Sequence, residues 1–204
     1  MEQQLLSVRT VRVQEIQKEL FRKGIHLFIA FVPVLASVHL LATFLLLGGG
    51  ILLYVVAELL RFQGLRVPVI SKVTEYASRE RDRGKIVLGP VTLGLGAMAA
   101  LFFYPDPAAS LAIYALAFGD GLSSVVGKLF GRERIPFTGG KTYAGSLTCF
   151  FAVFFFSFFI VRDPGIALVT AISATILEAL PLRDLDNVVI PLGTGLSVYI
   201  ALIL

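Results

Sequence analysis

Apolar runs of membrane-spanning length recur along most of this chain and limit the folds that it can adopt. A bilayer core of about 30 Å is crossed by a helix of about 17–25 apolar residues. We place such spans at roughly 24–40, 41–61, 87–104, 108–130, 145–161, 165–182 and 188–204, with a tight uncharged turn near 37–43 between the first two. The chain is 56% hydrophobic, above the roughly 45–50% of soluble domains. The sequence therefore predicts an all-α fold, a polytopic membrane helical bundle with about seven transmembrane helices.

The basic residues indicate how these spans are oriented. Seventeen of the eighteen Lys and Arg residues precede the first span or follow the second, fourth or sixth, and only Arg162 falls on the other side. Cytoplasmic segments of membrane proteins carry an excess of Lys and Arg. We therefore expect a multi-pass integral membrane protein whose N-terminus is cytoplasmic and whose C-terminus lies on the opposite side.

Two polar segments have the spacing of interfacial helices. In the first, Leu5, Val8, Val11, Ile16 and Leu20 recur at near-helical spacing among charges. We expect a single integral membrane domain over 1–204, with an amphipathic interfacial segment at 1–23 and the transmembrane bundle at 24–204. The segment 69–76 has a similar pattern, and for it a solvated loop is an equally good interpretation.

The 29-residue segment Phe118–Ser146 carries the most chemistry. Asp120 lies inside an apolar span, where an ionised side chain costs roughly 2.5–3.5 kcal/mol and usually marks a functional site. The segment then becomes basic and rich in glycine, the composition of loops that bind phosphate through backbone amides and cationic side chains. It lacks the Walker A pattern, because Ile135 stands where the required glycine would be. A buried acid followed by such a loop predicts an enzyme that handles a nucleotide at a membrane surface.

Further polar residues gather at the same cytoplasmic boundary. Glu19, Arg22, Lys23 and His26 share one helix face by their spacing. Glu58 and Arg61 end the second span, although they could simply form a helical ion pair. Oxygen donors suited to Mg²⁺ are available in Asp120, Glu178, Asp186 and Asn187. Topology explains the basic residues, so we expect no nucleic-acid partner.

Four motifs in order resemble the CTP-dependent lipid-alcohol kinases, the family of dolichol (polyprenol) kinase, phytol kinase and CTP-dependent diacylglycerol kinase. The motifs are Glu19, Arg22, Lys23 and His26; Asp120, Ser123, Gly127 and Gly131; Lys141, Thr142, Gly145 and Ser146; and Glu178, Asp186, Asn187 and Pro191. Two positions depart from the pattern, because Ser123 replaces a frequent Ala and Ala144 replaces an expected Glu. A similar Asp-and-glycine pattern occurs in phosphatidate cytidylyltransferases.

The resemblance implies transfer of the γ-phosphate of CTP to the hydroxyl of a membrane isoprenoid alcohol of the dolichol or polyprenol type, at the cytoplasmic face. Phytol, diacylglycerol and a cytidylyltransferase reaction are the alternatives, and a small transporter is a different class. The implied roles are catalytic for Asp120 and His26; nucleotide-binding for Lys128, Gly131, Arg132, Gly140, Lys141, Thr142, Gly145 and Ser146; Mg²⁺-binding for Asp120, Glu178, Asp186 and Asn187; and substrate-binding for Arg22, Lys23 and Glu58. The expected partners are the bilayer, the lipid alcohol and CTP, and a homo-oligomer is allowed for. We also expect Asp120→Asn to abolish turnover with near-normal expression.

Overall fold

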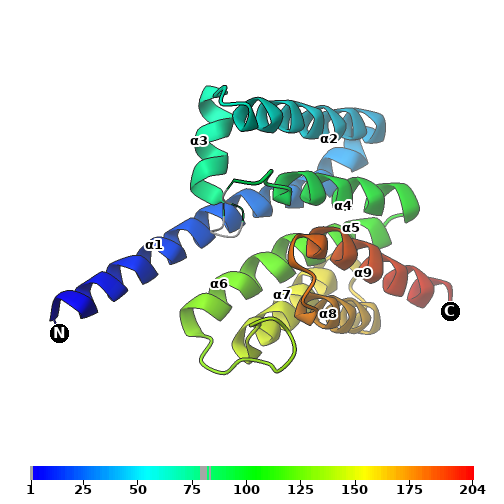
Figure 1. Cartoon of the computed structure of the whole chain (residues 1–204). Coiled ribbons are helices and arrows are strands. Elements are labelled where there is room, and N and C mark those ends of the chain that lie inside the picture. The colour runs from blue at the N-terminus through cyan, green and yellow to red at the C-terminus, as the bar shows by residue number, and fades with distance from the viewer. Residues whose placement is uncertain (1, 79–81, 83) are drawn as a thin grey trace.

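The computed structural model describes residues 2–78, 82 and 84–204, with side chains from Val13 onward. Within this part of the chain the secondary structure is helical, apart from a single antiparallel bridge between Arg134 and Thr142 (Figure 1). The all-α prediction is therefore confirmed. The side chains of Leu5, Val8 and Val11, on which the amphipathic N-terminal segment was partly predicted, lie outside the described residues.

The first part of the chain forms two long helical stretches. Helix α1 (Glu2–Leu27) continues through the 3₁₀ turn η1 (Phe28–Phe31) into α2 (Val32–Phe62). Within α2 the backbone of His39 is extended (φ −156°, ψ 94°), which separates two helical pieces at the predicted boundary near 37–43. Figure 1 shows that α2 then runs back towards α3 (Pro68–Ala77), which bridges the end of α2 and α1. The predicted amphipathic segment at 69–76 is thus helical.

The remaining elements form a packed bundle. They are α4 (Gly89–Phe103), α5 (Ala108–Tyr114), the π-helical turn η3 (Ala115–Asp120), α6 (Gly121–Phe130), α7 (Tyr143–Val161), α8 (Pro164–Ala179), the 3₁₀ turn η4 (Arg183–Leu185) and α9 (Asp186–Ile203). Leu111, Ile113 and Leu116 are fully buried, which places the stretch α5–η3 at the centre of the bundle. A Cβ on Gly96 would lie 2.0 Å from the carbonyl oxygen of Asn187, so α4 and α9 approach closely because this position has no side chain.

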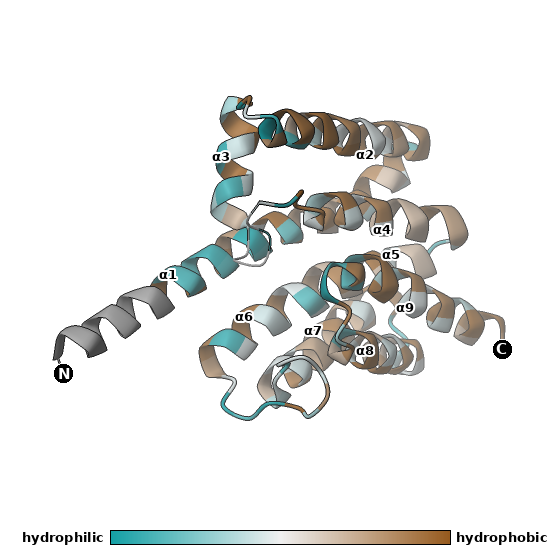
Figure 2. Cartoon of the chain, in the orientation of Figure 1, coloured by the Kyte–Doolittle hydropathy of each residue, from teal (hydrophilic) through white to brown (hydrophobic). Residues whose placement is uncertain are grey.

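The outer surface of the bundle is strongly apolar. Figure 2 shows hydrophobic residues along α2, α4 and α9, whereas hydrophilic residues gather on α1 and in the connection between α6 and α7. Four helical stretches in the described part are long and apolar enough to cross a membrane: Val13–Phe62, Ala108–Phe130, Tyr143–Val161 and Arg183–Ile203. The apolar helices Gly89–Phe103 and Pro164–Ala179 are shorter. The chain is therefore a multi-pass membrane protein, and the count of seven spans stays a prediction.

Candidate active site around Asp120

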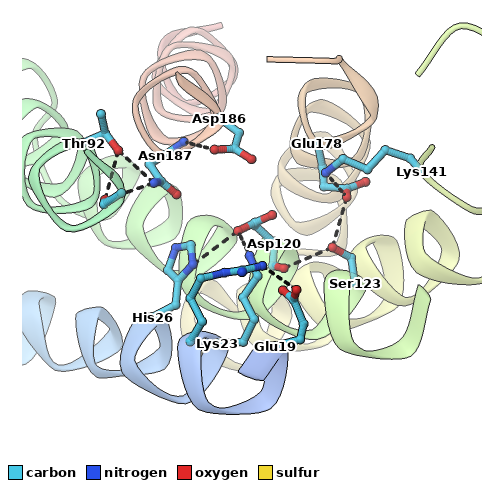
Figure 3. A network of polar contacts seen from close by, with 12 residues as sticks. Glu19, Lys23, His26, Thr92, Asp120, Ser123, Lys141, Glu178, Asp186 and Asn187 are labelled. Atoms are coloured by element: carbon cyan, nitrogen blue, oxygen red, sulfur yellow. Dashed lines mark hydrogen bonds and ion pairs between the residues drawn. The ribbon is translucent and has the colours of Figure 1, made fainter. Parts of the chain in front are cut away.

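Asp120 is the centre of a buried ion-pair network between α1 and the η3–α6 stretch (Figure 3). The side chain of Asp120 is 2% exposed and that of its partner Lys23 is 5% exposed. The Nδ1 atom of His26 lies 3.3 Å from Oδ2 of Asp120, the same oxygen that accepts the hydrogen bond from Lys23. The helical face predicted for α1 therefore meets the predicted buried acid, although the two residues of the ion pair are 97 positions apart.

A local irregularity of the backbone precedes this carboxylate. Residues Ala115–Asp120 form a π-helical turn between α5 and α6, within a helix predicted as one regular span. Single π-turns inside α-helices occur frequently at functional sites. Here the turn ends at Asp120 itself, and Asp120 is buried against α1.

Glu19 connects the next turn of α1 to the end of α6. Its carboxylate forms ion pairs with Arg22 on its own helix and with Nζ of Lys128 at 2.5 Å. The side chain of Glu19 is 3% exposed, whereas that of Lys128 is 46% exposed. Lys128 is therefore held at the border between the buried network and the solvent, where its charge is available to a ligand.

Glu178 of α8 is the centre of a second group of polar contacts. It is 2% exposed, and Nζ of Lys141 lies 2.6 Å from its Oε1 atom. The hydroxyl of Ser123 donates to Oε1 at 3.1 Å, and that of Ser146 donates to Oε2 at 3.4 Å. Burial alone would lower the pKa of Lys141, but the carboxylates of Glu178 and Asp120 outweigh it and raise the pKa above its usual value. Lys141 is thus a fixed cation beside the buried acids.

The connection between α6 and α7 forms a closed loop. The amide of Ile135 donates to the carbonyl of Lys141 at 2.8 Å, which joins the two sides of the loop. Gly139 and Gly140 at its tip have φ values of +71° and +105°, a conformation that other residues adopt at a cost. At its base a Cβ on Gly131 would lie 2.5 Å from Oγ1 of Thr142, so only glycine fits there. The glycine-rich composition therefore shapes this loop.

Asp186 and Asn187 begin α9, on the side of Asp120 that is opposite α1 (Figure 3). The side-chain amide of Asn187 donates to Oγ1 of Thr92 at 2.9 Å and to the carbonyl of Gly89 at 3.3 Å. These bonds fix the amide against the start of α4. Sequence reasoning did not find Thr92, because a lone threonine in an apolar helix gives no signal of its own.

A polar cleft of about 1040 Å³ opens between α1, α6, the α6–α7 loop and the end of α8. Most of the residues predicted to bind nucleotide or metal line it. They are Asp120, Lys128, Gly131, Gly140, Lys141, Thr142, Gly145, Glu178 and Asp186, and Arg22, which was predicted to bind substrate, lines the cleft as well. Arg132, Ser146 and Asn187 are not among its lining residues. Arg183 and Thr138 do line it and were not assigned a role from the sequence, because they belong to no motif.

A second cavity of about 290 Å³ lies between α1, α3 and the start of α4. It is lined by apolar residues together with polar ones, which include Lys23, His26, Asn187, Asp82 and Asp184. Arg22, Asp120 and Asp186 line both cavities, so the buried acid stands where the two meet. No motif indicated this cavity, because α3 contributes to it only through the tertiary fold.

Glu58 was expected to bind substrate, but it lines neither cavity. Its carboxylate, 1% exposed, pairs with Arg61 at 2.6 and 2.8 Å and accepts the amide of Val87 at 2.8 Å. Arg61 also donates to the carbonyl of Lys85 at 3.2 Å. These contacts tie the segment before α4 to α2. Glu58 and Arg61 therefore form the helical ion pair that was considered as the alternative.

The residues proposed for Mg²⁺ fit a cation that is shared with a ligand. In the described part of the chain, no three His, Cys, Asp or Glu side chains converge as a complete metal site. Mg²⁺ commonly takes only one or two carboxylates and completes its shell with water and substrate phosphates. Asp120 and Asp186 both line the polar cleft and satisfy that requirement.

These features define a class of protein: a multi-pass helical membrane protein with a buried acidic centre between a cationic cleft and an apolar cavity. Comparison with known proteins specifies it further. The chain is 27% identical over 213 residues to phytol kinase 1, chloroplastic, of Arabidopsis thaliana, covering 91% of this chain and 67% of that protein. It is 30% identical over 205 residues to farnesol kinase, chloroplastic, of the same plant, covering 90% and 66%. A probable phytol kinase of Zea mays is 24% identical over 208 residues.

The chain spans about two thirds of the length of these relatives. It belongs to the family of lipid-alcohol kinases that includes the phytol and farnesol kinases, the family that its motifs resemble. No protein-family model matches the chain. No solved structure matches it either.

Proposed function

We propose that this protein is a kinase that transfers the γ-phosphate of CTP to the hydroxyl of an isoprenoid alcohol of the phytol or farnesol type. The observation that carries the proposal is the position of Asp120 between a cationic, glycine-rich cleft and an apolar cavity. A water-soluble phosphate donor and a membrane-dissolved alcohol need separate compartments that meet at one reactive point, and the two cavities meet at this residue. The names of the relatives support the same reaction class.

The relatives favour phytol and farnesol over the dolichol-type alcohol expected from the sequence. The names printed for the matching proteins are phytol kinase, probable phytol kinase and farnesol kinase. The alternative that named phytol is therefore better supported than the main expectation. We adopt it for this chain.

The polar cleft would bind the triphosphate through fixed cations and backbone amides. Lys128 and Lys141 line it as cations that are anchored by Glu19 and Glu178. Gly140 at the loop tip permits close backbone approach, and Thr142 lies at the start of α7, where backbone amides favour anions. Phosphoryl transfer depends mainly on in-line positioning and charge neutralisation, which this set of residues supplies.

Asp120 and Asp186 would hold Mg²⁺ together with the phosphates, with Glu178 and Asn187 in support. A cation held there would neutralise charge that develops on the transferring phosphoryl group. Lys23 forms an ion pair with Asp120. This pairing compensates the buried carboxylate, which stands where it could ligate a cation.

The alcohol proton has two candidate acceptors. Oδ2 of Asp120 already accepts from Lys23 and faces Nδ1 of His26 at 3.3 Å, so a hydroxyl entering beside His26 would reach either group. His26 lines the apolar cavity, whereas Asp120 lines both. Asp120 would orient both the phosphate donor and the alcohol, because it lines both cavities. His26 would accept the proton of the alcohol hydroxyl.

One assay tests the reaction class. Purified protein in detergent receives Mg²⁺, γ-labelled CTP or ATP, and a panel of farnesol, phytol, a polyprenol and diacylglycerol. Labelled farnesyl or phytyl phosphate formed from CTP is the expected result. A parallel reaction with phosphatidate in place of the alcohols tests the rival, because label released from it as pyrophosphate, with no labelled lipid from any alcohol, would instead establish the cytidylyltransferase reaction. The absence of labelled lipid with every alcohol would end the proposal.

The cytoplasmic placement of the site can be tested by labelling. Phe137 at the loop tip is 98% exposed, and Cys149 is the only cysteine of the sequence and is buried. In a Cys149→Ser background, a membrane-impermeant maleimide should label Phe137→Cys from the cytoplasmic side of oriented vesicles. Asp163→Cys, in the connection that carries Arg162, should react from the other side. The reverse pattern would contradict the proposed orientation.

A further inference from the structure

The second cavity has the lining that a single-chain alcohol requires. Its apolar wall is formed by Ile25 of α1, by Val69, Ile70 and Val73 of α3, and by Leu93 of α4. The polar part of the lining includes Lys23, His26, Asn187 and the carboxylates of Asp82, Asp184 and Asp186, and Asp120 connects the cavity to the polar cleft. Small-molecule sites combine an apolar wall with polar groups that orient the ligand.

Helix α3 packs against the rest of the protein through its inner face. Ser71 and Thr74 on its inner face are buried, and Tyr76 packs edge-to-face against Phe21 of α1 with ring centroids 5.0 Å apart. Two of its apolar side chains remain at the surface: Val69 is 74% exposed and Val73 is 36% exposed. The cavity wall is therefore continuous with the apolar exterior of the protein.

We propose that this cavity is the binding site for the hydroxyl-bearing end of the isoprenoid alcohol, with α3 as its specificity-determining wall. The inference rests on the proposed kinase function and assigns its lipid subsite. The hydroxyl lies beside His26 and Asp120, and the first isoprene units lie against Val73 and Ile70. The tail leaves the cavity past Val69 into the bilayer.

The size of the cavity determines which alcohols fit. A volume of about 290 Å³ is at the lower end of the roughly 300–1,000 Å³ found for small-molecule sites. It accommodates the end of one chain and leaves no room for the two ester-linked chains beside the hydroxyl of diacylglycerol. We expect kcat/KM for farnesol, geranylgeraniol and phytol to agree within about tenfold, and diacylglycerol to be at least about tenfold poorer than any of them. Equal turnover of farnesol and diacylglycerol would overturn the assignment.

Two matched substitutions separate the cavity wall from the rest of the surface. Val73→Trp places an indole in the cavity, and the KM for farnesol should rise by at least about tenfold while the KM for CTP stays unchanged. Val56→Trp is the control, because Val56 on α2 is 46% exposed and lines neither cavity. Its kinetic constants should equal those of the unmodified protein. A folded Val73→Trp protein with the original KM for farnesol would refute the proposal.

Photo-crosslinking of the unmodified protein tests the same point without a substitution. The probe is a farnesol analogue with a diazirine next to the hydroxyl-bearing carbon, and adducts are expected at Asp120 or within 22–26, 68–77 or 89–93 and should decrease with excess farnesol. Adducts elsewhere, or adducts that farnesol does not displace, would disprove the subsite even if the protein phosphorylates farnesol. If the protein phosphorylates no alcohol, the kinase proposal fails separately, and displaced adducts at these positions would still identify the cavity as an alcohol site.

Discussion

Replacing Asp120 by asparagine should separate two effects of this residue, on stability and on chemistry. The substitution keeps the shape of the side chain but removes the charge that compensates Lys23. Because the side chains of the pair are only 2% and 5% exposed, the ammonium of Lys23 would be left buried without its carboxylate. The expectation of near-normal expression, drawn from the sequence, did not include this cost.

The size of the effect follows from the burial of the pair. Removing one partner of a buried ion pair typically costs about 3–5 kcal/mol. For a chain of this length, such a loss corresponds to a fall in Tm on the order of 10 °C. Turnover should fall independently by a factor on the order of 10² or more, as for other removed electrostatic or proton-transfer groups.

A second substitution distinguishes the two effects. In Lys23→Met with Asp120→Asn, the buried cation is removed as well, so about half or more of the lost stability should return, as expected for coupled neighbours. The chain has no tryptophan, but Cys149 is its only cysteine and is 1% exposed. Unfolding can therefore be followed in detergent with a dye that fluoresces on reaction with this thiol. Turnover of the double variant should remain as low as that of the single one.

Two results would refute this reasoning. If Asp120→Asn unfolds at the temperature of the unmodified protein, the ion pair does not stabilise the bundle. If the double variant recovers turnover along with stability, Asp120 is a structural residue and takes no part in the reaction.

Three further predictions concern Glu58 and the α6–α7 loop. Glu58→Gln should lower Tm in the same thiol-dye assay yet leave the KM for farnesol unchanged, and a raised KM would restore Glu58 to the site. Gly131→Ala should prevent folding of the loop, because the new Cβ would lie 2.2 Å from the carbonyl oxygen of Gly127. Gly24→Ala is the control, since Gly24 has open space around it, and this variant should melt like the unmodified protein. Lys141→Met should raise the KM for CTP about tenfold or more through loss of one charged contact to phosphate, and an unchanged KM in nucleotide titrations would exclude this lysine from the triphosphate site.

Much of the fold could be predicted from the sequence because membrane helices are specified locally. A run of apolar residues such as 145–161 must form a helix in lipid, where every backbone amide needs an internal partner. The helix Tyr143–Val161 matches that prediction closely. The break near His39 was also predictable, since an uncharged turn had to separate two spans. By contrast, the π-turn before Asp120 left no signal in a sequence that reads as one continuous helix.

The sequence by itself determined the helical membrane class, the shared face of Glu19, Lys23 and His26, and the glycine-rich basic loop. Each of these follows from composition or from spacing over a few residues, where the 3.6-residue period and backbone sterics act directly. Only the tertiary structure decided that Lys23 neutralises Asp120, that Glu58 anchors a segment instead of lining a cavity, and that α3 encloses an apolar site beside the acid. Those contacts join residues far apart in the chain, and they depend on how whole helices pack, which no local pattern encodes.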